Sequence, residues 1–221
     1  MDRLPAACNT LPLQAAGALP QRPSQIHHCY HATGNRRQVP AMPNRSDITI
    51  IPFEGIAPKI HPTVFIAPGA RIVGDVEIGE DSSVWFNVVI RGDVHFIRIG
   101  QRTNIQDLTM CHVTNQRFPL VVGNDVTVGH SAVLHGTTIG DRVLIGMGAK
   151  VLDNSVVESD ALIAAGAVVR EGFRVPQGTL AAGVPAKIIR ELSDQERAYV
   201  AKGAGNYISY VARFRADGND W

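Results

Sequence analysis

The stretch GTTIGDRVLIGMGAKVLDNSVVESDALIAAGAVV (residues 136–169) places an aliphatic side chain at every sixth position, and this spacing decides the fold. The aliphatic positions of this run are Ile139, Ile145, Val151, Val157, Ile163 and Val169, and the spacing continues to Val175. An earlier run has the same spacing at Ile60, Ile66, Ile72, Ile78, Val84 and Ile90. A helix would need a period of 3.6 and an ordinary strand a period of 2. A period of six predicts a solenoid, in which each unit supplies a short strand and a turn.

Three such units are expected to complete one coil of a triangular prism. The aliphatic side chain then points inward and stacks on its equivalents in adjacent coils, at the strand spacing of about 4.8 Å. Glycine often follows the aliphatic residue, at Gly79, Gly100, Gly123, Gly129, Gly140 and Gly146. We expect these glycines to supply turn conformations that other residues avoid. The predicted fold is an all-β solenoid, a parallel β-helix of hexapeptide repeats with a C-terminal α-helix.

The repeat is interrupted at three places. The interval from Ile90 to Ile99 is nine residues and that from Cys111 to Val122 is eleven, and a third adjustment follows Val128. Interruptions of a solenoid are loops on a rigid scaffold, and such loops often carry function.

Three parts of the chain are predicted: an extension (1–46), a β-helix domain (47–190) and a helix with a tail (191–221). The extension has six prolines, five arginines and one acidic residue, with no apolar period. We expect it to be disordered or dispensable, with organellar targeting as the alternative. Ser193 and Glu196 form a capping-box signature. Val200, Ala204, Tyr207, Ile208 and Val211 then recur at helical spacing, which predicts one helix of roughly 20 residues.

The composition argues against several function classes. The formal net charge of +1 gives no reason to expect a nucleic-acid partner. No apolar run approaches the roughly 18 residues of a membrane span, so no membrane association is expected. Three cysteines without a paired spacing favour a reducing compartment, and we expect the cytoplasm.

The chain after residue 46 contains five histidines, of which His112, His130 and His135 lie close together beside the interruptions. Three imidazoles are a common ligand set for a catalytic metal that keeps one position open. The five-residue gap between His130 and His135 does not place them one above the other in a coil. The spacing alone therefore leaves open whether they bind metal or serve as ordinary surface residues.

Two segments bear a resemblance that favours the metal site. RGDVHFIRIGQRTNIQDLTMCH (residues 91–112) and VGHSAVLHG (residues 128–136) resemble the γ-class carbonic anhydrase family of left-handed hexapeptide β-helices. The resemblance implies a homotrimer in which His112 and His135 of one subunit and His130 of its neighbour bind one divalent metal ion. Zinc is the expected metal, although three imidazoles also suit iron and cobalt.

The resemblance also implies roles for five further residues. Arg91 and Asp93 match an ion pair near the metal at the subunit interface, which could equally be structural. Gln106 matches the residue that holds the metal-bound water, and Asp107 is its neighbour in the same network. Tyr207 matches a tyrosine that the C-terminal helix brings toward the site, or it is only an apolar helix-face residue. The implied reaction is reversible hydration of carbon dioxide to bicarbonate by a metal-bound hydroxide.

The sequence departs from the best-studied archaeal type where that enzyme exports protons. Val94 replaces a glutamate, and the short loop at residues 113–120 contains no acid. We therefore expect weak hydratase activity. Two alternatives stay open: a non-catalytic trimeric assembly or binding protein of the same family, and a hexapeptide acyltransferase or thioesterase. The tail AAGVPAKIIR (residues 181–190) is shared by the wider superfamily and does not separate them.

Overall fold

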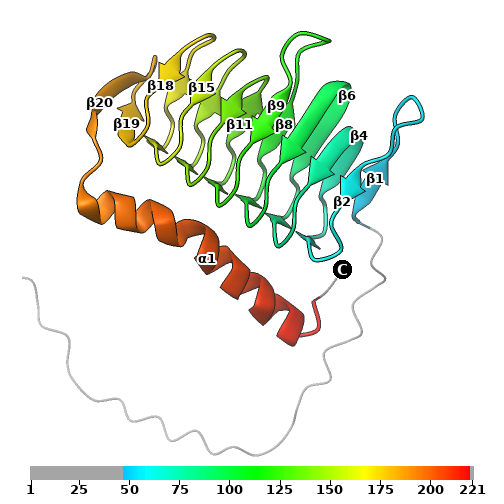
Figure 1. Ribbon diagram of the computed structural model, residues 1–221. Coiled ribbons are helices and arrows are strands. Elements are labelled where there is room, and N and C mark those ends of the chain that lie inside the picture. Colours follow the sequence, from blue (N-terminus) through cyan, green and yellow to red (C-terminus); the bar gives the residue numbers. More distant parts are fainter. Residues whose placement is uncertain (1–46, 220–221) are drawn as a thin grey trace, which may run out of the picture. The chain divides into compact units, whose positions relative to one another are not determined.

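The computed structural model describes residues 47–219, which form a left-handed parallel β-helix of about seven turns with one C-terminal helix (Figure 1). The expected solenoid is confirmed. The predictions for residues 1–46 lie outside the described residues. Within residues 47–219, the helix is not long and apolar enough to cross a membrane.

The coils build a prism with three faces, which we name A, B and C. Face A holds β1 (Thr49–Ile51), the first halves of β4 (Arg71–Ile78) and β6 (Val89–Ile99), β8 (Met110–His112), β11 (Val133–His135), β14 (Lys150–Val151) and β17 (Val168–Val169). Face B holds β2 (Lys59–Ile60), the second halves of β4 and β6, β9 (Leu120–Val122), β12 (Thr138–Ile139), β15 (Val156–Val157) and β18 (Arg174–Val175).

Face C is an eight-stranded sheet and carries the helix. It holds β3 (Phe65–Ile66), β5 (Ser83–Val84), β7 (Asn104–Ile105), β10 (Thr127–Val128), β13 (Leu144–Ile145), β16 (Leu162–Ile163), β19 (Thr179–Ala182) and the antiparallel β20 (Lys187–Glu191). The turns between faces run along three edges of the prism, the A–B, B–C and C–A edges. Strands β4 and β6 are long because each bends across the A–B edge.

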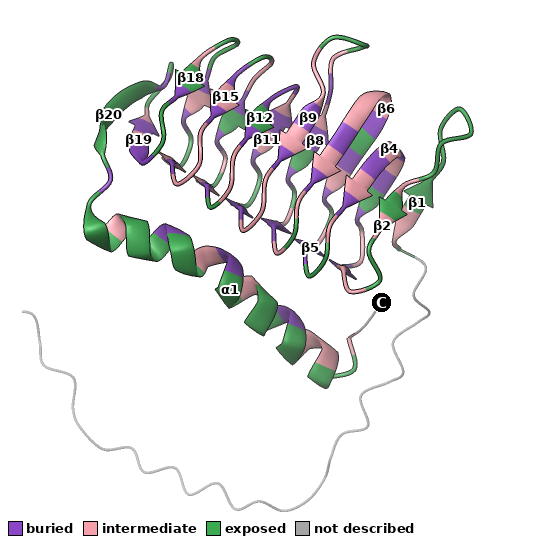
Figure 2. Ribbon diagram, viewed as in Figure 1, coloured by how far each residue is buried: buried purple, intermediate pink, exposed green. Residues whose placement is uncertain are grey.

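The aliphatic residues of the six-residue repeat form the core. Equivalent positions pair in parallel register from coil to coil, as Ile72 with Ile90 and Ile145 with Ile163. All members of both runs are buried except Ile60, which is half-buried at the end of the prism (Figure 2). Cys111 is fully buried at one of these inward positions. The hexapeptide spacing therefore predicts the inward-facing side chains correctly.

The predicted role of the glycines after the aliphatic residues is wrong. None of the six has a positive φ, and the left-handed turn positions hold residues such as Asn87, Arg102 and Arg142 as well as other glycines. A Cβ at Gly79 or Gly123 would instead lie within 3 Å of the backbone of the next coil. These glycines are needed because adjacent coils approach closely, and turn conformation is not the reason.

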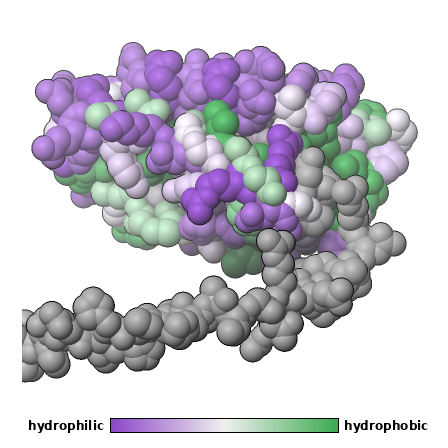
Figure 3. Space-filling view, turned by 90° about the horizontal axis from the view of Figure 1, so that it is seen from below, coloured by the Kyte–Doolittle hydropathy of each residue, from purple (hydrophilic) through white to green (hydrophobic). Residues whose placement is uncertain are grey.

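Helix α1 (Asp194–Ala216) lies along face C. Ser193 and Glu196 form the predicted capping box, with both reciprocal hydrogen bonds present. Phe65 and Trp85 of the prism pack against Phe214 and Tyr207 of the helix. The helix therefore covers a sidewall of the prism. Figure 3 views the molecule from below, where apolar patches lie among polar side chains.

Candidate metal centre

His112 and His135 are the last residues of β8 and β11, and they stand one above the other at the A–B edge. The two residues are partners in the parallel register of these strands. Nδ1 of His112 lies 3.1 Å from Nε2 of His135. Their imidazoles are half-buried and directed toward one another, so two of the three predicted ligands are brought together within one chain.

Asp93 holds the far side of the His112 ring. Its Oδ1 lies 3.0 Å from Nε2 of His112, and its other oxygen accepts a hydrogen bond from Arg91. Burial opposes ionisation of Asp93, but the bonds from Arg91 and His112 outweigh it and lower the pKa of this carboxyl group. The pKa of His112 is also lowered, by burial first and by the nearby positive charge of Arg91, which together outweigh Asp93. His112 is therefore neutral near pH 7, as a metal ligand must be.

Asp153 holds the far side of the His135 ring, and the sequence patterns did not identify it. Its Oδ1 lies 2.5 Å from Nδ1 of His135, and its Oδ2 accepts a hydrogen bond of 2.6 Å from the hydroxyl of Thr114. These two bonds outweigh burial and lower the pKa of Asp153. A signal was present, because residue 153 follows residue 135 by eighteen, one more than the seventeen residues that separate paired positions of β11 and β14, so the two residues lie in adjacent coils.

His130 lies on a different edge from the other two histidines. It sits in the C–A turn five residues before His135, at the opposite end of β11, with nearly half of its side chain exposed. Its Nδ1 lies 2.7 Å from Oδ2 of Asp107, which belongs to the equivalent turn of the preceding coil. No group of three metal-binding side chains comes together within residues 47–219. A single subunit therefore does not assemble the three predicted ligands.

Gln106 and Tyr207 accompany His130 on the C–A side. Gln106 is buried, and its amide donates to Oδ1 of Asn104, whose own amide donates to Thr127. Tyr207 reaches this side from α1, and burial together with the charge of Asp107 raises its pKa to about 12. At neutral pH its hydroxyl stays protonated, so Tyr207 can donate a hydrogen bond but is poorly suited to carry protons.

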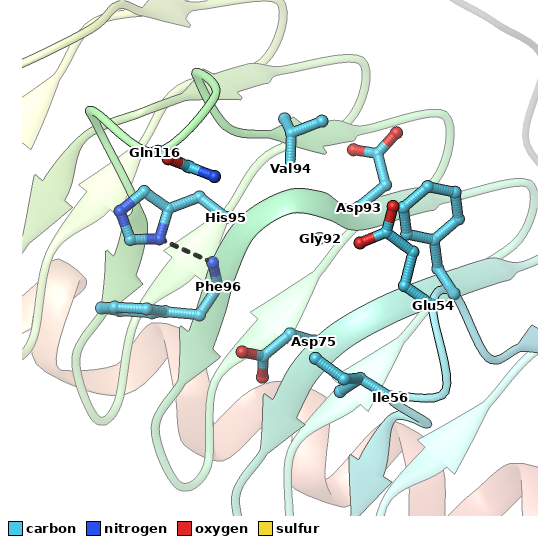
Figure 4. Close-up of a pocket in the computed structure, with 10 residues that line it drawn as sticks. Glu54, Ile56, Asp75, Gly92, Asp93, Val94, His95, Phe96 and Gln116 are labelled. Carbon is cyan, nitrogen blue, oxygen red and sulfur yellow. Dashed lines mark hydrogen bonds between the residues drawn. The ribbon is translucent and has the colours of Figure 1, made fainter.

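A cavity of about 290 Å³ opens on the A–B edge beside Asp93 (Figure 4). Val94 and His95 line it from the bend of β6, and Gln116 lines it from the short loop between β8 and β9. Nδ1 of His95 accepts a hydrogen bond from the backbone N–H of Phe96. The long interval between Ile90 and Ile99 in the repeat thus corresponds to a widened bend that borders this cavity.

The donor set fits a divalent metal. Each predicted ligand histidine has one ring nitrogen next to a carboxylate, which leaves Nδ1 of His112 and Nε2 of His130 and His135 available as ligands. Zinc bound to imidazole at about 2.0–2.1 Å in a tetrahedral site separates two ligand nitrogens by roughly 3.3 Å. The 3.1 Å between the facing nitrogens of His112 and His135 is close to that separation.

Comparisons with known proteins identify the family of this chain. Residues 57–92 and 136–171 match a family model described as bacterial transferase hexapeptide (six repeats). The chain is 44% identical to a carbonic anhydrase of Geobacillus kaustophilus over 162 residues, which cover 70% of this chain and 88% of that protein. The chain belongs to the γ-carbonic anhydrase-like family.

Two further comparisons show similarity over about three quarters of this chain. Gamma carbonic anhydrase 2, mitochondrial, of Arabidopsis thaliana is 45% identical over 168 residues, which cover 74% of this chain. The chain spans only 60% of the length of that plant relative. A crystal structure of a hexapeptide transferase family protein from Anaplasma phagocytophilum has a TM-score of 0.72 and 42% identity, covering 75% of this chain and 98% of that one.

Proposed function

We propose that the protein is a metal-dependent carbonic anhydrase that reversibly hydrates carbon dioxide to bicarbonate. The observation that carries the proposal is the pair of facing nitrogens on His112 and His135, each imidazole held from behind by its own carboxylate. The names of the similar proteins support the reaction. Zinc is the proposed metal, with iron and cobalt as alternatives.

The proposed site lies between subunits of a homotrimer. His112 and His135 stand at one end of the face A strands, and His130 stands at the other end of the same face. A threefold axis parallel to the prism would bring the A–B edge of one copy to the C–A edge of the next copy. His130 would then meet the facing pair at the same height along the prism, because all three residues belong to adjacent coils.

The side chains around the ligands have distinct proposed roles. A divalent metal held by the three histidines would lower the pKa of a bound water to about 7, which would supply hydroxide at neutral pH. Asp93 and Asp107 each fix one ring nitrogen of a ligand histidine and so direct the other ring nitrogen outward. Arg91 keeps Asp93 ionised. Gln106, with its amide fixed by Asn104, would orient the attacking oxygen, and the protonated Tyr207 would donate a hydrogen bond.

Mixed trimers test the shared site. His130→Ala and His112→Ala each damage every site of their own trimer, so neither variant alone should retain metal or hydrate carbon dioxide. A trimer that contains both kinds of subunit has one interface with all three wild-type histidines. Refolding the two variants together in equal amounts should therefore restore about one quarter of the wild-type sites.

The measurement is metal content per subunit together with the initial rate of carbon dioxide hydration. A site contained in one subunit would give no recovery in the mixture, and this outcome would contradict the proposed arrangement. Recovery of about one quarter of the metal with no hydration at any buffer concentration would favour the alternative, a non-catalytic assembly protein of the same family.

We place the protein in the cytoplasm, which agrees with the lack of a paired cysteine spacing. Organellar import through residues 1–46 is the alternative, since the plant relative is named mitochondrial. Attaching residues 1–46 to a fluorescent reporter and following its location tests the choice. An organellar signal from the reporter would contradict a cytoplasmic location.

A further inference from the structure

Among residues 47–219, Asp153 is the one carboxylate that contacts a proposed ligand from the coil after it. It contacts Nδ1 of His135 at 2.5 Å and accepts from Thr114 at 2.6 Å, so both of its oxygens are used. Its side chain is 18% exposed. The arrangement links three separate segments: the end of β11, the turn after β14 and the short loop between β8 and β9.

The turn beneath Asp153 leaves room for this carboxylate. A Cβ at Gly136, the residue after His135, would overlap Oδ1 of Asp153. Gly136 also has a φ of +51°. Its carbonyl accepts from the backbone N–H of Asn154, next to Asp153. Glycine is therefore favoured at residue 136 mainly because a Cβ there would overlap the carboxylate of Asp153.

Thr114 fixes the second oxygen of Asp153 from the opposite side. The loop that carries Thr114 is closed by backbone hydrogen bonds between Thr114 and Phe118. Because both the turn below and the loop beside it are held by backbone bonds, the Asp153 carboxylate has a defined direction toward His135.

We propose that Asp153 is a positioning residue for His135 in the metal site. A carboxylate on Nδ1 keeps the proton on that nitrogen, orients the ring and leaves the Nε2 lone pair for the metal. This inference rests on the proposed function of the histidines. It extends the site to a coil in which the sequence motifs indicated no functional residue.

The competing interpretation is that Asp153 only stabilises the fold. Asp160 is the matched control, because it is a part-buried aspartate of the same coil that accepts two hydrogen bonds from Arg142 and contacts no histidine. A purely structural carboxylate should behave like Asp160, with an effect on stability and none on metal affinity.

The experiment uses the full-length trimer and zinc ions as the probe. The zinc affinity of Asp153→Ala, Asp153→Asn, Thr114→Val and the control Asp160→Asn is measured by competition with a chromophoric chelator. Asp153→Ala should bind zinc about 10- to 100-fold more weakly, the range found when such supporting partners are removed. Asp153→Asn keeps an acceptor oxygen, so its zinc affinity should lie between that of Asp153→Ala and that of the wild type. Thr114→Val should bind zinc severalfold more weakly at most.

Two further measurements separate the interpretations. The thermal midpoint of each metal-free variant reports its stability, and the visible absorption of the cobalt-substituted protein reports ligand geometry. An altered cobalt spectrum in Asp153→Asn, with the Asp160→Asn spectrum unchanged, supports the proposal. A lower thermal midpoint with zinc affinity within twofold of the wild type for both Asp153 variants overturns it.

Failure of the proposed function gives a different result. Wild-type trimer that binds no zinc, iron or cobalt would end the metal proposal and this inference together. Wild-type trimer that binds zinc, with Asp153 variants that bind equally well, would end this inference alone. If Asp153→Ala does not fold, Asp153→Asn and Thr114→Val still decide the question.

Discussion

At both the A–B and the B–C edge of the prism, basic side chains stack on carboxylates. The two edges differ in whether the basic side chain keeps a free lone pair. At the B–C edge Arg102 forms two hydrogen bonds with Asp125, and Arg142 does the same with Asp160. At the A–B edge the basic partners are His112 and His135. In both places the carboxylate comes from a neighbouring coil.

The chemistry of the base explains the difference. A guanidinium is always protonated, has no lone pair to offer and uses its fork of donors on the carboxylate. A neutral imidazole gives one nitrogen to the carboxylate and keeps a lone pair on the other. The same stacking geometry therefore gives a cross-link between coils at one edge and the pair of proposed metal ligands at the other.

Replacing the imidazole by a guanidinium tests this comparison most directly. In His135→Arg the new side chain should pair with Asp153 as Arg142 pairs with Asp160, while the lone pair is lost. We expect zinc affinity to fall by more than about 100-fold, beyond the loss from removing a supporting partner. The thermal midpoint of the metal-free protein should stay within a few degrees of the wild type.

Zinc competition and thermal unfolding check this prediction. Arg142→His is the reverse control, and it should gain no zinc site because it has no second histidine facing it. Retained zinc affinity in His135→Arg would contradict the assignment of His135 as a ligand.

The A–B edge also borders the cavity beside Asp93. A group that transfers protons can therefore be introduced next to the proposed site through a residue that lines this cavity. General acid–base help contributes about 10² to 10⁴ in rate, and Val94 offers none. Val94→Glu places a carboxylate in the cavity lining and should raise hydration about tenfold at low buffer concentration. Initial rates against imidazole buffer at fixed pH and ionic strength are the measurement.

The matched control is Val94→Gln, which has a similar shape and cannot titrate. Equal rates for the glutamate and glutamine variants would show that residue 94 lies off the proton route. A wild-type rate that is fast and independent of buffer would contradict the expectation of limited proton export.

Substitutions at the B–C edge should lower the stability of the protein and leave its zinc affinity unchanged. Arg142→Gln removes the paired hydrogen bonds to Asp160 and retains a side chain other than glycine at this left-handed position. Because Arg142 is about half exposed, we expect a loss of about 0.5–1 kcal/mol in unfolding free energy. This corresponds to roughly 1–4 °C in thermal midpoint for a chain of this size. Scanning calorimetry measures the shift, and an altered zinc affinity would show that the two edges are coupled.

The exposed ion pair between Arg190 and Glu196 lies outside both edges and should have the smallest effect. Hydrogen bonds from Arg190 and Ser193 lower the pKa of Glu196 from 4.5 to about 2. Because the folded-state pKa is the lower one, the stabilisation is present above pH 4.5 and is lost as the pH falls toward 2. We expect wild type and Glu196→Gln to differ slightly at pH 6 and to converge at pH 2. Urea unfolding midpoints of both proteins across this pH range check the prediction. A difference in stability that widens in acid would contradict it.

Most of the fold could be predicted from the sequence because inward positions need one kind of side chain. The six-residue period therefore located residues such as Ile145 and Val157. The turns were less predictable, since Leu108 and Arg142 adopt the left-handed conformation that was expected of glycine. Coil stacking holds these residues in that conformation, and a local sequence pattern does not record it.

Only part of the candidate site could be predicted from the sequence, for a similar reason. The histidines are recognisable by type and by resemblance, but their facing pair depends on register between β8 and β11. Asp153 was missed because its partner is one coil away, so no short motif contains both residues. The ligand roles of the three histidines and the trimer stay predictions until the experiments above are done.

The eighteen-residue coil gives protein engineers a simple rule for placing side chains. Val156 pairs with Arg174 and Thr138 with Val156 at an interval of eighteen residues, the same interval that separates Asp153 from His135. The loop at residues 113–119 lengthens the interval between His112 and His135 to twenty-three, yet their strands remain in register. Insertions at an edge thus change the numbering without changing the height of the coils. A histidine–aspartate pair could be installed on other coils of such a prism by counting along the chain, with surface loops of any length left in place.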